Sequence, residues 1–304
     1  MSGLRERFQR MKRCEYWVIA YRRRKENRAV PEDVSGFRML PQKRFITQAD
    51  PFLFIHQGKT WLFYERQDLT DMKGTLWCLN LDDPKGRPLL VLEERFHLSY
   101  PQVFRYGKYT YMLPETRQGG EVRLYRCACF PGKWERVEQI LPLEAVDTTL
   151  VRAGEGRSGE SHAYYAFTYT DKRLELYYLE LAADRFHVVS REKIYASPPS
   201  KESRPGGAIY TEGGKLYRPA QNCTDYYGQE LILYVIDRLD KDGFQEHEAC
   251  RLRPEQFSVP GVNAIGIHTY NRNEHYEVID LLHREESLCT IGKKIEWKLR
   301  GMGK

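Results

Sequence analysis

Three acidic residues far apart in the chain, Asp50, Glu115 and Asp147, have the side chains with the most direct chemical use. Cleavage of a glycosidic bond needs a carboxylic acid to protonate the leaving oxygen and a carboxylate to activate water or attack the sugar. A third carboxylate raises the pKa of the acid by like-charge repulsion. We therefore predict that these three residues form a catalytic set. The alternative is that each lies at a solvated turn or strand end, and an Asp before a Pro, as at Pro51, often caps a turn.

A second set of residues suits a ligand that is rich in hydroxyl groups or carries negative charge. Arginine binds carboxylate or phosphate through two parallel hydrogen bonds, and tyrosine offers an aromatic face together with a hydroxyl. The alternatives are structural, because the arginines can pair with acids at the rim and a strand histidine can be a satisfied buried group. The predicted substrate-binding residues are Glu65, Tyr100, Arg204, Arg218, Gln221 and His268.

Other kinds of chemistry lack their sequence signatures. Cys127 and Cys129 would share one face of a strand, but no second pair of Cys or His residues has the spacing of a zinc site. No glycine-rich phosphate loop precedes a helix, and no Ser or Cys lies in a recognisable nucleophile elbow. We therefore expect neither a metal nor a cofactor.

Five similar units, spaced about fifty residues apart, must position these side chains. Each unit is a short apolar strand, a polar or Gly-containing turn and an alternating aromatic strand, and further strands follow in most units. This pattern is typical of propeller blades, so the sequence predicts an all-β, five-bladed β-propeller. A β-sandwich with long insertions is the alternative fold. The units begin near residues 50, 100, 147, 204 and 264.

The ends of the chain complete this prediction. Residues 16–21 read as a strand without a nearby partner, so we expect them to close the ring by joining the last blade. Helix is expected mainly at residues 4–13, within a basic leader at residues 1–14. No linker interrupts the chain, so residues 1–304 are expected to form a single domain.

Propeller geometry would bring the candidate residues together. The first strands of all blades run in the same direction along the central channel, so their starts gather at one mouth. The second strands run back, so their ends return to that mouth. The first-strand starts are Asp50, Tyr100, Asp147, Arg204 and His268, and the second-strand ends are Glu65, Glu115, Asp171, Arg218 and Asp280.

The formal charge of +6 is concentrated at the amino terminus. The segment from Met1 to Arg24 contains eight basic and two acidic residues and therefore supplies all of the net charge. It is either a solvated helix or a contact with an anionic membrane or a phosphorylated partner. The rest of the chain has no basic stripe with interleaved aromatics, which argues against binding to nucleic acid.

Cysteine usage and the amino terminus bear on location. The seven cysteines are irregularly spaced, and the basic amino terminus lacks the apolar core of a secretion signal. Both observations favour a reducing compartment, so we expect a cytoplasmic protein. No segment approaches the roughly 20 apolar residues that cross a bilayer.

The motifs resemble two groups of known propellers. Ala49-Asp50-Pro51, with the Gly-x-x-Trp-x-x-Tyr run at residues 58–64, resembles the clan of arabinanases, β-xylosidases, levanases and invertases. Over nearly the whole chain the sequence resembles the propeller domain of glucosamine inositolphosphorylceramide transferases. In those proteins the propeller precedes a glycosyltransferase domain. The motifs that carry this second resemblance lie at residues 98–104, 112–115, 124–126, 130–131, 134, 217–222, 227–228 and 266–269.

The resemblance implies roles and also shows departures. In the hydrolase clan the blade-one Asp is base or nucleophile, a second acid donates the proton and a third tunes its pKa, which implies these roles for Asp50, Glu115 and Asp147. Tyr100-Pro101 replaces the Asp-Pro with which the clan's second blade usually opens, and we expect no transferase domain in this chain.

Two functions of different classes follow. The first is a glycoside-hydrolase-like propeller that acts on a sugar or glycoconjugate in glycan or glycolipid biosynthesis or turnover. The second is a non-catalytic module that binds a saccharide for a partner glycosyltransferase. A pure interaction scaffold is a third possibility. The sequence does not specify the sugar, the linkage or the stereochemical outcome.

Overall fold

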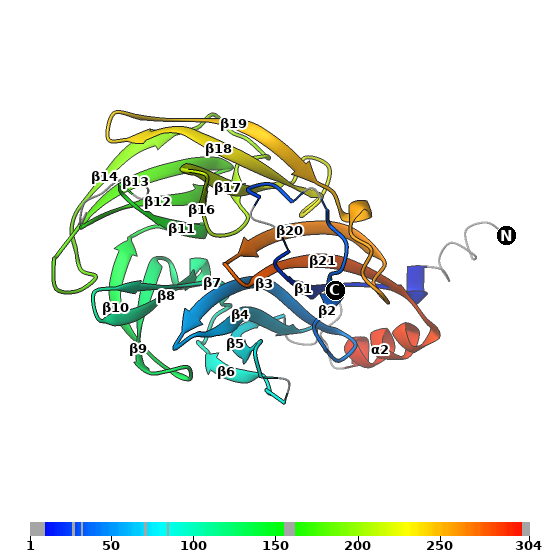
Figure 1. Cartoon of the computed structure of the whole chain (residues 1–304). Helices are drawn as coiled ribbons and strands as arrows, with labels where there is room; N and C mark the ends of the chain where they lie inside the picture. Colours follow the sequence, from blue (N-terminus) through cyan, green and yellow to red (C-terminus); the bar gives the residue numbers. More distant parts are fainter. Residues whose placement is uncertain are drawn as a thin grey trace.

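The chain folds into five antiparallel sheets arranged in a ring around a common axis (Figure 1). The computed structural model describes residues 10–299 apart from 26–27, 32, 70–71, 84 and 155–161. The predicted all-β, five-bladed β-propeller is confirmed, and the sandwich alternative is wrong. The strands are amphipathic ribbons whose apolar faces must be covered, and a closed ring of sheets covers them on both sides.

Blades I to III each contain four strands in sequence order from the axis outward. Blade I comprises β3 (Ile46–His56), β4 (Lys59–Asp68), β5 (Gly74–Asn80) and β6 (Leu89–Leu92). Blade II comprises β7 (Ser99–Tyr106), β8 (Tyr109–Glu115), β9 (Val122–Cys129) and β10 (Lys133–Leu141), with a short 3-10 helix, η1 (Arg117–Gly119), after β8. Blade III comprises β11 (Val146–Arg152), β12 (Ala163–Thr170), β13 (Arg173–Leu181) and β14 (Val188–Ala196).

Blades IV and V depart from this simple order. Blade IV has its inner edge divided between two short strands, β15 (Arg204–Pro205) and β16 (Tyr210–Glu212), which both pair with β17 (Lys215–Asn222). Its outer strands are β18 (Glu230–Asp240) and β19 (Gly243–Leu252), followed by η2 (Pro254–Gln256). Blade V comprises β20 (Ala264–Arg272), β21 (Tyr276–Glu286), β1 (Arg13–Arg23) and β2 (Arg38–Met39).

The amino-terminal strand closes the ring, as predicted. β1 pairs with β21 over its whole length, from Arg13 opposite Glu286 to Arg23 opposite Tyr276. Blade V is therefore built from both ends of the chain. This closure removes the free edge that a sheet of β20 and β21 alone would leave.

The core is divided into five apolar clusters, one at each interface between neighbouring blades. Burial of these side chains between sheets is the main source of stability in such a ring. Representative buried pairs, from interface I–II round to V–I, are Phe63 and Met112, Leu113 and Ala166, Phe167 and Phe244, Leu233 and Ile279, and Tyr64 and Val278.

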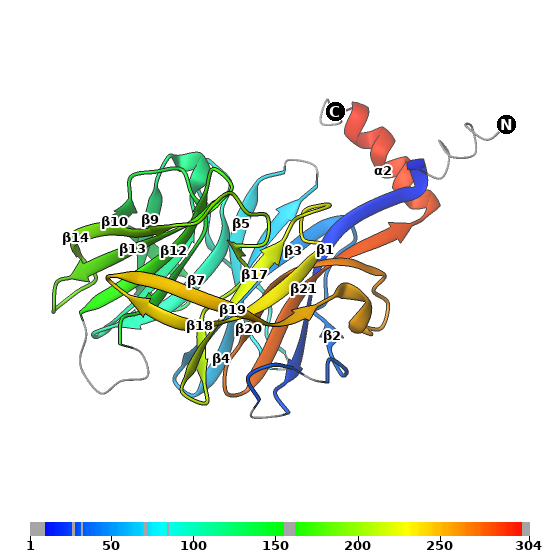
Figure 2. The same cartoon turned by 90° about the horizontal axis from the view of Figure 1, so that it is seen from above.

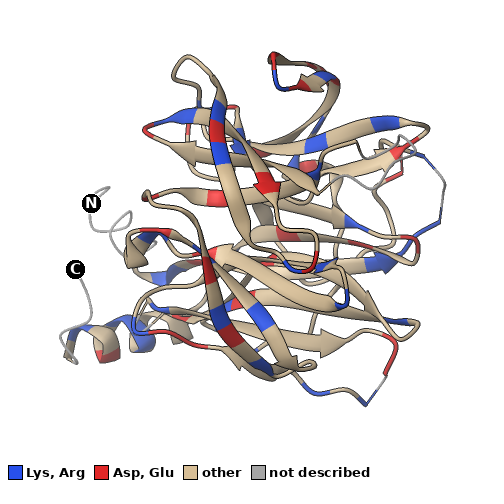
Figure 3. Cartoon of the chain, turned by 90° about the vertical axis from the view of Figure 1, so that its left-hand side faces the viewer, with Lys and Arg blue, Asp and Glu red and all other residues tan. Residues whose placement is uncertain are grey.

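Positions of charged residues of both signs are interspersed along the strands that face the viewer in Figure 3. Many charged residues of the ring form ion pairs with one another. Arg251 on β19, for example, binds Glu230 on β18 at 2.7 Å and also pairs with Glu202 and Glu248. Glu230 is buried, so this pair is partly shielded from water, whereas fully exposed pairs contribute little stability individually.

One helix was not expected from the sequence. α2 (Leu288–Leu299) follows β21 and projects from the ring beside the start of β1 (Figure 2). Its Trp297 packs edge-on against Phe45, with ring centroids 6.1 Å apart. The expectation that helix is confined to residues 4–13 is therefore wrong for the carboxyl-terminal segment. Most of the helix predicted at residues 4–13, namely residues 4–9, lies outside the described residues.

Candidate active site

The first strands of blades I, II and III begin with the same backbone irregularity. Asp50, Tyr100 and Asp147 have φ values of 50°, 51° and 50°, in the left-handed region that non-glycine residues rarely adopt. In each strand the pairing register shifts at this residue, as between Ala49 and Phe52 in β3. A bulge of this kind redirects a side chain out of the sheet, and such strained residues are concentrated at functional sites. The three positions are thus structurally equivalent.

The second strands contribute two glutamates at equivalent positions. Glu65 on β4 lies opposite Ala49, and Glu115 on β8 lies opposite Ser99. Each is therefore next to the bulge of its own blade. Both carboxyl groups reach the same cavity as Asp50.

This cavity has a volume of about 180 Å³. It contains five of the nine predicted site residues, namely Asp50, Glu65, Glu115, Arg204 and His268. The remaining lining residues are Trp17, Thr47, Ala49, Gln67, His97, Ser99 and Tyr227. Residues from blades I, II, IV and V are thus brought to one place, as strand polarity predicted.

Asp147 lies directly beside this cavity and is held in place by two donors. Arg204 donates through Nε to Asp147 Oδ2 at 2.5 Å, and Gln221 donates through Nε2 to the same oxygen at 2.7 Å. The carboxyl group of Asp147 lies beside that of Glu115 and, together with burial, raises the pKa of Glu115. Two neighbouring carboxyl groups favour a state in which one of them carries a proton.

Burial and neighbouring negative charge raise the pKa values of Glu115 and Glu65. Burial, reinforced by the charge of Asp147, holds the pKa of Glu115 well above its usual range, although Arg204 opposes this shift. Burial, reinforced by Asp50 and Glu115, likewise raises the pKa of Glu65. Both groups therefore hold their proton to a higher pH than an exposed glutamate does.

His97 contacts Glu65 in one defined tautomer. The backbone N–H of Gly74 donates to His97 Nδ1 at 3.0 Å, so that nitrogen is an acceptor and Nε2 carries the proton. His97 Nε2 lies 3.4 Å from Glu65 Oε1. Burial lowers the pKa of His97, which favours this neutral form.

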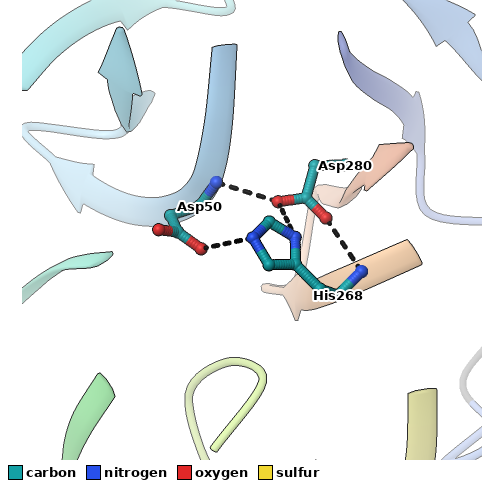
Figure 4. Close-up of side chains that lie close together, drawn as sticks. All are labelled: Asp50, His268 and Asp280. Atoms are coloured by element: carbon teal, nitrogen blue, oxygen red, sulfur yellow. Dashed lines mark hydrogen bonds and ion pairs between the residues drawn. The ribbon is translucent and has the colours of Figure 1, made fainter. Parts of the chain in front are cut away.

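A second buried group links blade I to blade V (Figure 4). His268 Nδ1 lies 2.7 Å from Asp280 Oδ2, and His268 Nε2 lies 3.5 Å from Asp50 Oδ1. The two oxygens of Asp280 also accept the backbone N–H groups of Asp50, His268 and Thr269, at 2.9, 3.2 and 2.8 Å. Asp280 thereby ties the bulge of blade I to the start of blade V.

Asp50 and His268 influence each other's ionisation. Burial raises the pKa of Asp50 to about 6, with His268 opposing and Asp147 and Asp280 adding to the shift. Burial alone would lower the pKa of His268, but the carboxylates of Asp280 and Asp50 outweigh burial and raise it. Asp50 also accepts the hydroxyl of Thr269 at 2.9 Å and the backbone N–H of Tyr100 at 3.2 Å.

Asp50, His268 and Asp280 also have the spacing of a metal site, because their ligand atoms all lie within 4.8 Å of one another. The sequence predicted no metal, and the structure brings together a group with metal-like geometry. The carboxylate oxygens of Asp50 and Asp280 already accept the hydrogen bonds described above. A protonated imidazole cannot bind a metal, so a metal ion would have to displace the proton of His268.

Three predicted binding residues do not line the cavity. Tyr100 is fully buried and bonds Thr149 at 2.8 Å and the backbone N–H of Gly207 at 2.7 Å, so it crosses from blade II towards blade IV. Gln221 does not line the cavity but donates a hydrogen bond to Asp147 beside it. Arg218 is fully buried and donates two hydrogen bonds to Glu246, at 2.7 and 2.6 Å. Its contacts are those of a structural ion pair within blade IV.

Among the lining residues that were not predicted, three carry aromatic rings. Trp17 comes from β1 and stacks on His268 with ring centroids 3.8 Å apart. Tyr227 lies between β17 and β18, edge-on to His268 at 5.2 Å. His97 lies in the connection between blades I and II. The Tyr227-Gly228 pair had been noted only as a family motif.

Solved structures with this fold include glycoside hydrolases. The catalytic domain of a GH62 α-L-arabinofuranosidase from Coprinopsis cinerea matches with a TM-score of 0.55 over 78% of this chain and 90% of that chain, at 10% identity. A GH43_1 enzyme from Xanthomonas citri matches with a TM-score of 0.53 over 78% and 86%, also at 10% identity. At such low identity the likeness shows the fold alone. The class of protein is thus a five-bladed β-propeller with the architecture of these enzymes.

The family is defined by sequence. Residues 40–281 match the family described as glucosamine inositolphosphorylceramide transferase 1, N-terminal, and the chain belongs to that family. Glucosamine inositolphosphorylceramide transferase 1 of Oryza sativa subsp. japonica is 32% identical over 207 residues, which cover 65% of this chain. The Arabidopsis thaliana protein of the same name is also 32% identical over 207 residues, 66% of this chain. In both cases the match spans only 27% of the relative's length.

Among the described residues, no helix is long and apolar enough to cross a membrane.

Proposed function

We propose that this propeller is a carbohydrate-active enzyme that acts on a terminal sugar of a glycan or glycoconjugate, in its biosynthesis or turnover. One observation carries the proposal: two carboxyl groups that line the same cavity have partners of opposite kind. Asp50, with a pKa of about 6, accepts hydrogen bonds from Thr269 and Tyr100 that favour its carboxylate, whereas burial and the neighbouring Asp147 raise the pKa of Glu115. A carboxylate beside a carboxyl group that holds its proton more strongly than usual can supply a base and an acid at the same pH.

In the proposed mechanism each acid has a distinct role. Glu115 protonates the leaving oxygen of the glycosidic bond, while Asp50 activates a water molecule or attacks the sugar. Asp147 keeps Glu115 protonated through its charge, and Arg204 with Gln221 fixes the position of Asp147. Arg204, His268 and Glu65 line the cavity and would contact the substrate.

The size of the cavity limits what can enter it. Its volume of about 180 Å³ lies below the roughly 300–1,000 Å³ of pockets that enclose whole drug-sized ligands. We therefore propose that a single sugar unit at the end of a longer molecule enters the cavity. The relatives are named as transferases of glucosamine and inositolphosphorylceramide, so a sugar-bearing lipid is the first glycoconjugate to test.

The second candidate is a non-catalytic module that binds a saccharide for a partner glycosyltransferase. The engagement of Asp147 by Arg204 and Gln221 favours it, because a carboxylate held by two donors is suited to rigid recognition. Contact of the segment from Met1 to Arg24 with an anionic membrane would suit either function and stays a proposal, as does a cytoplasmic location.

The test is a panel of glycans, glycolipids and nucleotide sugars incubated with the wild type and with Asp50→Asn, Glu115→Gln and Glu65→Gln. We expect Glu115→Gln and Asp50→Asn to lower turnover at least about 100-fold, which is typical for loss of a general acid or base. Glu65→Gln should mainly weaken binding. Glu175→Gln is the matched control, because Glu175 is a buried carboxylate on β13 bonded to Lys193 and Tyr177.

The outcomes separate the two candidates. Turnover in the wild type that disappears in Glu115→Gln but persists in Glu175→Gln supports the enzyme. Saccharide binding without turnover in any protein supports the module. If Asp50→Asn and Glu115→Gln leave both binding and turnover unchanged, the proposed site is wrong.

A further inference from the structure

A groove of about 660 Å³ lies beside the cavity, between the connection from β17 to β18 and blade V. It shares two lining residues with the cavity, Trp17 and Tyr227, so the two spaces are neighbours. The volume of the groove falls within the range of pockets that hold whole ligands, whereas the volume of the cavity lies below that range. The other lining residues are Glu15, Tyr226, Glu255, Ala264, Ile265, Leu282 and Arg284.

Aromatic side chains form the boundary between the groove and the cavity. Tyr226 and Tyr227 are 47% and 44% exposed, and they are the only tyrosines among the strongly exposed large apolar side chains of the described residues. Trp17 lies edge-on to Tyr227 with ring centroids 6.0 Å apart. Half-exposed rings at the edge of a pocket offer apolar faces to a ligand that is apolar on one side and polar on the other.

Polar groups on these rings remain available for a ligand. Among the described residues, none is hydrogen-bonded to the indole N–H of Trp17 or to the hydroxyl of Tyr227. Both groups can therefore bond hydroxyls of a molecule that passes from the cavity into the groove. A sugar unit has apolar C–H faces and a rim of hydroxyls, which is the chemistry that this pattern recognises.

The groove is built before any ligand arrives. Tyr226 donates its hydroxyl to the carbonyl of Ile265 at 2.9 Å, and the N–H of Ile267 donates to the carbonyl of Gly228 at 2.8 Å. Gly228 has a φ of +70°, and a Cβ there would lie 2.5 Å from the ring of Trp17. Only glycine allows the chain to pass this close to Trp17, so the loop holds Tyr226 and Tyr227 in fixed positions.

The charges of the groove favour a neutral occupant. Arg284 donates through Nε to Glu15 at 2.9 Å, so these charges offset each other and Glu255 leaves the lining one negative charge in excess. An acidic lining repels phosphate and carboxylate groups. By contrast, a cleft of about 550 Å³ that shares Arg204 with the cavity contains three basic and two acidic residues.

We infer that the groove is a second saccharide subsite, which binds one or more uncharged sugar units linked to the unit in the cavity. The inference rests on the proposed function in one respect, namely that a sugar occupies the cavity. It adds that the ligand is an oligosaccharide chain or a glycoconjugate with at least two sugar units, which leaves the cavity across Trp17 and Tyr227.

The test measures affinity against chain length. The probes are galactose, xylose, arabinose and N-acetylglucosamine with their di- and trisaccharides, titrated calorimetrically into the wild type, Tyr226→Ala and Tyr226→Phe. We expect at least one series in which the di- or trisaccharide binds the wild type more tightly than the monosaccharide. Tyr226→Ala should reduce this gain about five- to tenfold, whereas Tyr226→Phe, which keeps the ring, should retain most of it.

Tyr178→Ala is the control, because Tyr178 is a half-buried tyrosine on β13 that lies outside both spaces. If the gain with chain length is absent in the wild type or unchanged in Tyr226→Ala, the inference is overturned, and so it is if no saccharide binds. Failure of the proposed enzyme gives a different result, namely that oligosaccharides bind with the expected length dependence but are not turned over.

Discussion

The carboxyl groups around the propeller axis differ between the two halves of the ring. In blades III and V, Asp147 and Asp280 accept hydrogen bonds from Arg204, Gln221 and backbone N–H groups. In blades I and II, Glu65 and Glu115 face the cavity with far fewer partners, whereas Asp50 of blade I faces the cavity and also accepts hydrogen bonds from Thr269 and Tyr100. Among the described residues, the one ion-pair partner of Glu65 is His97 at 3.4 Å, and Glu115 lies beside the carboxyl group of Asp147, which together with burial raises its pKa.

This difference distinguishes carboxyl groups that stabilise the structure from carboxyl groups that are available for proton transfer. A buried carboxylate that accepts several hydrogen bonds fixes the groups around it, and its loss exposes unpaired donors. A buried carboxyl group with few donors is held in its neutral form by its surroundings and keeps a proton to give. The two halves therefore predict opposite consequences of substitution, one on stability and the other on activity.

The largest expected effect on stability is that of Asp280→Ala. The change would leave the N–H groups of Asp50, His268 and Thr269 and the imidazole of His268 without their buried acceptor. We expect the free energy of unfolding to fall by about 3–5 kcal/mol, as for other broken buried ion pairs. Urea unfolding followed by tryptophan fluorescence measures this change.

The matched variant is Glu115→Gln, which replaces a protonated carboxyl group by a neutral group of similar shape. It should change the free energy of unfolding by less than about 1 kcal/mol. Equal losses for Asp280→Ala and Glu115→Gln would remove the distinction between the two groups of acids.

The expected change of stability with pH is smaller than the effect of Asp280→Ala. The pKa of Asp50 is raised from 3.8 to about 6 on folding, so between these values the folded state binds more protons than the unfolded state. Stability therefore falls as the pH rises from about 4 to about 6, by about 1.4 kcal/mol per unit of pKa shift. The raised pKa of His268 acts in the same direction, because its stabilising charge is lost as the pH rises through its folded value.

Asp50→Asn should abolish the part of the pH dependence of stability that arises from the titration of Asp50. Urea midpoints of the variant and the wild type, measured at pH 4.5, 6.0 and 7.5, should shift progressively in favour of the variant as the pH rises. Glu175→Gln should follow the wild type. A constant gap between Asp50→Asn and the wild type would show that burial does not hold a proton on Asp50.

The smallest effect is expected from metal ions. The oxygens of Asp280 and Asp50 already accept hydrogen bonds, and the raised pKa of His268 favours its protonated form. We therefore expect Ca²⁺ and Zn²⁺ to leave the melting temperature unchanged. A rise in melting temperature that saturates with metal concentration and disappears in His268→Ala would instead assign a metal site to Asp50, His268 and Asp280.

The fold could be predicted from the sequence because units that recur about every fifty residues indicate propeller blades. The same repeats put Asp50, Glu115 and Asp147 at the same end of their blades, so their proximity could also be predicted. Once Asp50, Tyr100 and Asp147 are aligned as strand starts, propeller polarity brings them together. The left-handed backbone at these residues was not readable, since only bulge formation in the folded sheet produces it. The carboxyl-terminal helix α2 was missed because it lies beyond the last repeat and is not part of the fifty-residue pattern.

The errors at the site have equally specific causes. Arg218 and Gln221 were grouped because they are close in sequence, but an odd spacing along a strand places side chains on opposite faces. Arg218 therefore meets Glu246, while Gln221 meets Asp147. Trp17 reaches the cavity only because β1 joins β21, which lies more than 250 residues away in the chain. No local pattern marks such a contact.

The central claim is that Glu115 carries a proton near neutral pH. The most direct measurement is a titration of the glutamate carboxyl carbons by ¹³C NMR in selectively labelled wild-type protein, Glu115→Gln, Glu65→Gln and Glu175→Gln. The account predicts a carboxyl resonance that remains protonated at pH 7 and disappears in Glu115→Gln but not in Glu175→Gln. If the resonance assigned to Glu115 by its loss in that variant titrates in the ordinary range of an exposed glutamate, Glu115 is not the acid and the proposed chemistry fails.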